Sequence, residues 1–261
     1  MCRYLFIIFP LLFTPALASE NVSSMLKKAD LFRIPAESVR AEARVELFKN
    51  DKFDKERLYT VYVKPKRRSL IIMRSPSEIG QKVLMLANQF WLLMPDSQRP
   101  LRITANQKLL GEASTGDIAS MTWSDDYSGQ VEKKVTCPEV PSTLKKYIFP
   151  SVNEITSDCL VLNLKAVETG VTYASVKLYL EAETKLPIKA DLFVDSGKRA
   201  KEAWYFADEH QGRKHILTMV LLNDIEVNQR TVVNYNNISI KEAPDEFFNP
   251  AALIRNSLSG W

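Results

Sequence analysis

Few polar residues of this chain have the types and spacing that catalysis or metal binding needs. The two histidines, His210 and His215, flank an expected hairpin turn and have no third ligand nearby in sequence. The segment Ser114–Asp117 is better explained as a helix start, with a hydroxyl cap and an acid in the first turn. The adjacent carboxylates Asp125 and Asp126 point apart on an extended chain. With no Gly-x-Ser-x-Gly elbow and no glycine-rich phosphate loop, the sequence predicts no enzyme, no metal site and no cofactor.

Two cysteines, Cys137 and Cys159, follow the N-terminal leader described below. Two cysteines in an oxidising compartment usually pair. A redox or metal role would want a Cys-x-x-Cys spacing or nearby histidines, and neither occurs. We therefore expect a disulfide that closes a proline-rich insert over residues 137–159 and stabilises the fold by roughly 3 kcal/mol.

The first eighteen residues have the pattern of a secretory signal. Arg3 supplies a positive start, an apolar run follows over Leu5–Leu12, and Ala16–Ala18 is a small-x-small cleavage site. The predicted mature chain, residues 19–261, has 34 basic and 31 acidic residues, a net charge of +3. This balance does not favour nucleic acid. The absence of a linker or repeat predicts one exported domain. No lipid anchor is expected, because Cys2 lies before the apolar run and not at a cleavage site.

Extended segments dominate the chain. Val39–Leu47 alternates apolar and charged residues, which is typical of a strand with one dry and one wet face. A short helix is expected at Ser24–Phe32, capped by Ser23, another at Thr115–Met121 and a last one at Ala251–Leu258. Short connections predict an antiparallel meander of about eleven strands. Since so few helices cannot cover a flat sheet, we expect a curled sheet, an incomplete or half β-barrel wrapped over short helices.

The segment from Val83 to Met94 is unusually apolar. Only Asn88 and Gln89 interrupt it, where a hairpin turn would place them. The two strands on either side carry apolar side chains on both faces. Both faces must therefore be covered, by helices, another sheet or a bound apolar ligand.

The order of landmarks around this segment resembles the LolA-like outer-membrane lipoprotein-sorting proteins. The residues that carry the resemblance are Gly80, Met85, Leu86, Trp91, Pro95, Arg99, Arg102, Ile103, Leu110, Gly111, Asp117 and Ile118. The chain departs from the pattern at Glu112-Ala113 and in the insert. The resemblance implies a periplasmic carrier that shields lipoprotein acyl chains or another lipid between the two membranes. Its implied partners are an inner-membrane transporter of the ABC or RND type and an outer-membrane acceptor, with transient membrane contact only.

An apolar cavity on one concave face would hold the cargo. Its candidate lining residues are Val61, Val63, Met73, Leu84, Leu86, Trp91, Leu93, Met219 and Leu221. Arg99 and Arg102 are candidates for steering the cargo or closing the cavity. Release requires a movable lid, either the N-terminal helix or Thr115–Met121. The basic turn Lys64–Arg68 is by default solvated, although it could also meet anionic headgroups.

Two other functions remain open at this point. In the first, the same residues form a filled core, and the protein is a periplasmic binding module of an envelope export or assembly machine. In the second, the scaffold supports a hydrolase. The sequence does not identify the cargo, the transporter or the oligomeric state.

Overall fold

A computed structural model describes residues 21–97, 99–119, 122–149, 158–210, 212–223 and 228–251. The leader predicted over residues 1–18 and all but the first residue of the helix predicted at Ala251–Leu258 lie outside these ranges. Within them, no helix is long and apolar enough to cross a membrane.

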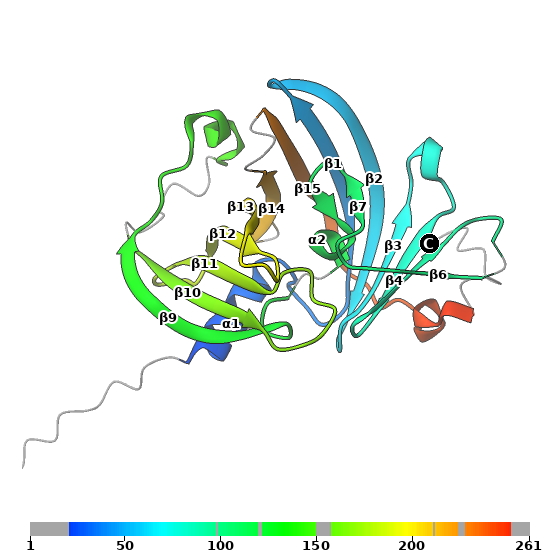
Figure 1. Ribbon diagram of the computed structural model, residues 1–261, viewed down its shortest axis with the longest axis horizontal. Helices are drawn as coiled ribbons and strands as arrows, with labels where there is room; N and C mark the ends of the chain where they lie inside the picture. Colours follow the sequence, from blue (N-terminus) through cyan, green and yellow to red (C-terminus); the bar gives the residue numbers. More distant parts are fainter. Residues whose placement is uncertain are drawn as a thin grey trace, which may run out of the picture.

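One large antiparallel sheet forms most of the molecule (Figure 1). Its thirteen strands are β1 (Val39–Lys49), β2 (Lys52–Lys64), β3 (Arg68–Met73), β4 (Lys82–Leu86), β5 (Gln89–Leu93), β6 (Leu101–Ile103), β9 (Tyr127–Thr136), β10 (Asp158–Ala166), β11 (Ser175–Glu181), β12 (Pro187–Phe193), β13 (Arg199–His210), β14 (Arg213–Leu222) and β15 (Gln229–Ile240). The remaining described elements are the hairpin β7 (Lys108–Leu110) and β8 (Ala113–Ser114), the helices α1 (Val22–Leu31) and α2 (Thr115–Ala119), and the 3-10 turns η1 (Pro76–Glu78), η2 (Ser142–Tyr147) and η4 (Asp245–Phe248).

The strands follow the order β6-β5-β4-β3-β2-β1-β15-β14-β13-β12-β11-β10-β9. The chain therefore meanders outward from β1 to β6, and from β9 it meanders back until β15 pairs with β1. The sheet curls without closing, and α2 lies between its two walls (Figure 1). The predicted fold class is confirmed. The count of about eleven strands was low, because thirteen strands join this sheet, the three-residue β6 among them, while β7 and β8 form a separate two-stranded sheet.

The N-terminal helix was predicted in the right place with the wrong cap. α1 begins at Val22, and its N-cap is Asn21, whose side-chain oxygen accepts a hydrogen bond from the Ser24 amide at 2.7 Å. Ser23 lies inside the first turn. Asparagine is as good a cap as serine, so the choice depends on where the buried face of the helix must start.

Apolar side chains cover both faces of β2 to β5, as the sequence requires. The inner face joins the main core, which also holds Met25 and Leu26 of α1 and Ile118 of α2. The outer face forms a smaller cluster with Phe247 and Phe248 of η4. The C-terminal segment therefore covers the side of the sheet that the helices do not.

The predicted disulfide is present, with an S–S distance of 2.02 Å between Cys137 and Cys159. Beyond it, the described part of the insert folds back onto the core. Leu144 is buried there, and the Tyr147 ring lies 5.8 Å from that of Phe206 in β13. The insert thus packs against β13.

Candidate functional site

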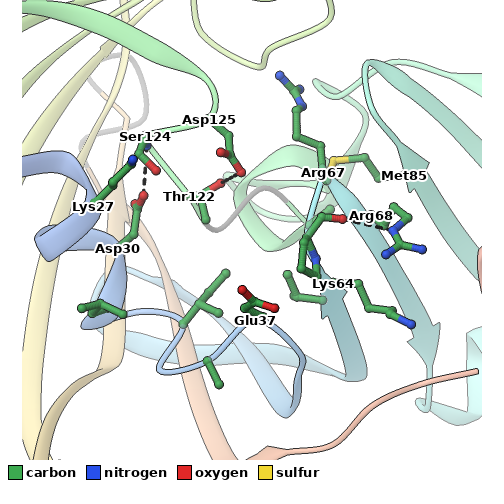
Figure 2. A pocket seen from close by; sticks show the side chains of 16 residues that line it. Lys27, Asp30, Glu37, Lys64, Arg67, Arg68, Met85, Thr122, Ser124 and Asp125 are labelled. Carbon is green, nitrogen blue, oxygen red and sulfur yellow. Dashed lines mark hydrogen bonds between the residues drawn. The ribbon is translucent and has the colours of Figure 1, made fainter. Parts of the chain in front are cut away.

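A cleft of about 500 Å³ opens between α1 and the β2–β3 turn (Figure 2). Five parts of the chain enclose it: α1 with the segment after it, the β2–β3 turn, β4, α2 and the loop that follows α2. The lining residues are Lys27, Asp30, Leu31, Ile34, Ala36, Glu37, Val63, Lys64, Pro65, Arg67, Arg68, Met85, Ala119, Thr122, Ser124 and Asp125. Its size lies within the range of small-molecule sites, roughly 300–1,000 Å³.

Two of the cations in this lining point away from the cleft. Successive strand residues face opposite sides of the sheet, so Val63 faces the core, while Lys64 and Arg68 lie toward the outer cluster. The buried Lys64 ammonium donates to Asp245 at 2.8 Å, and an Arg68 guanidinium nitrogen donates to the same carboxylate at 3.0 Å. In Figure 2 both side chains extend to the side of the turn away from α1. These residues therefore give the cleft mainly their backbone and aliphatic carbons.

The Asp30 carboxylate ties α1 to the loop that follows α2. Its two oxygens accept hydrogen bonds from the backbone amides of Trp123 at 2.6 Å and Ser124 at 3.0 Å. Burial raises the pKa of this carboxyl to about 6, although both amides favour the charged form. This contact joins two of the elements that line the cleft.

Polar contacts between turns join the two walls of the sheet at the same rim. Arg67 of the β2–β3 turn forms a 2.8 Å ion pair with Asp126, which directly precedes β9. The Asn88 side chain in the β4–β5 turn donates to the Thr169 hydroxyl at 2.8 Å. A Cβ on Gly170, whose φ is +75°, would stand 2.6 Å from the Asn88 carbonyl oxygen, so this approach requires glycine.

A buried polar cluster holds α2 in place. The Asp117 carboxylate accepts from Lys201 of β13 at 2.8 Å, from the Tyr173 hydroxyl at 2.6 Å and from the Ser114 amide at 2.8 Å. Burial opposes ionisation here, but the Lys201 charge and these donors together hold the pKa of Asp117 below its usual value. Lys201 also donates to the Glu112 carbonyl oxygen. Since both charges are buried and fully engaged, α2 is anchored to the sheet.

The nine predicted cavity residues do not share one face. Val63 lines the cleft. Val61, Met73, Met219 and Leu221 belong to the main core on the inner face. Leu84, Leu86, Trp91 and Leu93 lie in the outer cluster against η4. The single concave face predicted for all nine is wrong for these last four, because β4 and β5 present alternate residues to opposite sides and both sides are apolar.

The two predicted arginines lie away from the cleft. Arg102 pairs in register with Trp91 and stacks over its indole ring at 4.8 Å, on the outer side of the sheet. Arg99 lies in the loop before β6, where its amide is 3.2 Å from the Ser97 hydroxyl oxygen. Neither residue lines the cleft, so the geometry gives no support to a role in closing it.

Sequence reasoning missed Ile34, Met85 and Ala119 as lining residues. Met85 had a usable signal, because it alternates with Leu84 and Leu86, and its partner Ser69 in β3 places it on the inner face. Ile34 and Ala119 had no such signal, since Ile34 lies after the end of α1 and Ala119 is the last residue of α2. Among the described residues, no group of three His, Cys, Asp or Glu side chains could hold a metal ion.

Comparisons with known proteins agree with this architecture. A LolA superfamily protein from Nitrosomonas europaea superposes with a TM-score of 0.75 at 25% identity, covering 88% of this chain and 98% of that one. A family model described as "Uncharacterized protein" matches residues 65–255. The chain belongs to this family. Its fold is that of the LolA superfamily, and the resemblance inferred from the sequence is confirmed.

Two further solved structures share the LolA-like fold. A DUF1329 family protein from Desulfovibrio piger has a TM-score of 0.66 at 18% identity, covering 88% of this chain and 97% of that one. An outer membrane lipoprotein-sorting protein domain from Vibrio parahaemolyticus has a TM-score of 0.66 at 16% identity, covering 89% and 98%. No curated protein matches the sequence.

Proposed function

We propose that this protein is a periplasmic carrier that shields an acyl chain of a lipoprotein or another lipid between the inner and outer membranes. The cleft between α1 and the β2–β3 turn is the observation that carries the proposal. Ile34, Val63, Met85 and Ala119 give it apolar walls. Holding an acyl chain in water costs about 0.8 kcal/mol per methylene, so a cargo crossing the periplasm needs such a shelter.

The LolA-like fold is a carrier or binding fold and is not that of a known enzyme family. The match to the LolA superfamily protein covers 88% of this chain. We therefore extend the proposal to a single domain over residues 19–261, exported by the leader. Loading would come from an inner-membrane transporter of the ABC or RND type, and unloading would go to an outer-membrane acceptor. Contact with either membrane would be transient.

Cargo release needs a part of the cleft wall that can move, and α1 fits this role better than α2. The Asp117–Lys201 pair anchors α2 through buried charges. α1 is joined to the adjacent loop through Asp30, and its exposed Leu31 lies at the edge of the cleft. Of the two lid candidates suggested by the sequence, we therefore retain α1.

A specific observation favours the rival, a non-carrier binding module. The space between the two walls is partly filled by the chain itself, since Trp123 packs edge-on against Tyr205 at 5.5 Å and both rings are buried. A module that never carries lipid would fill its interior in this way. The two functions differ in whether the purified protein contains lipid.

Native mass spectrometry of the protein purified from its own envelope tests the proposal. We expect the wild type to carry an acylated ligand and Val63→Asp to be empty, because a charge inside the cleft opposes hydrocarbon. Leu86→Asp is the matched control, since Leu86 is also half-buried but lies on the outer face of β4. Circular dichroism checks folding. Wild-type protein that is empty in repeated preparations contradicts the carrier and supports the binding module.

A further inference from the structure

A second, smaller cavity lies deeper in the molecule, beside the large cleft. It measures about 40 Å³, room for roughly one or two water-sized groups. Its lining residues are Arg33, Gly116, Asp117, Thr122, Trp123, Asp126, Tyr127, Thr172, Tyr173, Leu192, Tyr205 and Met219. Polar and aromatic side chains dominate this lining.

Arg33 is a charged residue of this cavity with incomplete hydrogen bonding. The residue is 6% exposed, and its Nε has no hydrogen-bond partner. The guanidinium carbon lies 4.7 Å from the centre of the Trp123 ring and 6.0 Å from that of Tyr205. The aromatic rings hold the cation in position without accepting its Nε hydrogen.

Both carboxylates that line the small cavity are committed to other cations. Asp117 is paired with Lys201 at 2.8 Å, and Asp126 is paired with Arg67 at 2.8 Å. The nearby Asp30 carboxylate, just outside this lining, accepts the amides of Trp123 and Ser124. Leaving a buried donor of a charged group unsatisfied is costly, and an acceptor entering the cavity would remove that cost.

The two cavities are neighbours along the chain and in space. Thr122 lines both cavities. Of the next two residues, Trp123 lines the small cavity and Ser124 lines the large cleft. Thr122 and Ser124 are visible at the wall of the large cleft in Figure 2. An amphiphile with its hydrocarbon in the large cleft would have its head near this wall.

We propose that Arg33 binds the carboxylate of an acyl chain whose hydrocarbon lies in the large cleft. This inference depends on the proposed lipid-binding function and adds the chemistry of the head. The cargo class is then a free fatty acid or a lipid bearing a carboxylate at the head of its chain. An ester carbonyl offers the same acceptor oxygen without the charge, so the test separates the two sources.

The experiment is a competition between palmitate and methyl palmitate in equal amounts, with bound ligand quantified by native mass spectrometry. A hydrogen bond to a charged group contributes about 1.5–3 kcal/mol, against about 0.5–1.5 kcal/mol for a neutral pair, and the difference of about 1–1.5 kcal/mol corresponds to roughly a 5- to 13-fold preference for palmitate. Arg33→Gln should bring the ratio close to one, while Arg33→Lys, which keeps the charge, should retain part of the preference. Arg40→Gln is the control, because Arg40 binds Glu42 in β1 and lines neither cavity.

The outcomes separate this inference from the function on which it depends. Wild-type protein that binds both ligands equally, or Arg33→Gln protein that keeps the wild-type ratio, overturns the role of Arg33 and leaves the carrier intact. Wild-type protein that binds neither ligand overturns both proposals. If the Arg33 variants fail to fold, the wild-type ratio alone still decides whether the site prefers a carboxylate.

Discussion

The size of the large cleft sets a limit on the length of acyl chain that the protein can shield. Each buried methylene contributes about 0.8 kcal/mol, so each added carbon should tighten the dissociation constant about fourfold. The cleft of about 500 Å³ would hold on the order of 16 methylenes, if each occupies about the volume of a water, roughly 30 Å³. Carbons beyond that number remain in water and add nothing, so affinity should rise with chain length and then level off.

Met85→Trp tests whether this limit comes from the cleft. Met85 is buried and lines it, so a larger ring should fill part of the space and move the break to shorter chains. Leu86→Trp is the matched control on the next residue of β4, because Leu86 lies with the outer cluster. Isothermal titration of a series of saturated fatty acids, below their micelle-forming concentrations, measures the slope and the break for each protein.

Three results would refute this reasoning. Affinity that keeps rising at the same slope well beyond the break would mean that the chain extends elsewhere in the molecule. A break that does not move in Met85→Trp would place the chain outside the cleft. An equal shift in Leu86→Trp would show that both substitutions act through general disturbance of β4.

Three further predictions concern the contacts that shape the cleft and its surroundings. Replacing both Cys137 and Cys159 by serine should lower the free energy of unfolding by about 3 kcal/mol in urea titrations, because the unfolded chain regains the freedom of the closed loop; an unchanged midpoint would contradict this. Lys201→Met should lower the free energy of unfolding by about 3–5 kcal/mol, because it leaves the Asp117 carboxylate buried without a counter-charge. Adding Asp117→Asn should recover part of that loss, and no recovery would show that the charge is not the cause. The third prediction uses the pKa of Asp30, which burial raises to about 6 in the folded protein from 3.8 for an unperturbed aspartate. At a pH between these two pKa values, the native state holds a proton that the unfolded chain has released. The free energy of unfolding of the wild type relative to Asp30→Asn should therefore fall by roughly 3 kcal/mol as the pH rises from about 4 to about 6. Parallel stability curves for the two proteins would refute it.

Much of the fold could be read from the sequence because its signals are local. The alternation along Val39–Leu47 identified β1, and the polar pair Asn88-Gln89 located the break between β4 and β5 to within one residue, since the turn residues are Ala87 and Asn88. The two cysteines of the predicted mature chain left one intrachain pairing. For the strands, the physical cause lies within a few neighbouring residues. For the disulfide, two cysteines allow only one pairing within the chain.

The assignment of faces was less successful for a physical reason. Alternation tells which residues share a side of a strand, but on β4 and β5 both sides are apolar, so the pattern does not tell which side is the interior. The C-terminal Phe247 and Phe248 cover one side, and they are more than 150 residues away in sequence. The burial of Lys64 against Asp245 depends on the same distant contact.

The sequence by itself determined that the chain forms a curled antiparallel sheet with a disulfide-closed insert, because periodicity, turn residues and cysteine count are properties of neighbouring residues. Only the tertiary structure decided where the hollow is and what surrounds it. The cleft and the Arg33 cavity exist because α1, the β2–β3 turn and the loop after α2 meet in space. A cavity is the volume that packing leaves unfilled, and that volume depends on all the surrounding elements together.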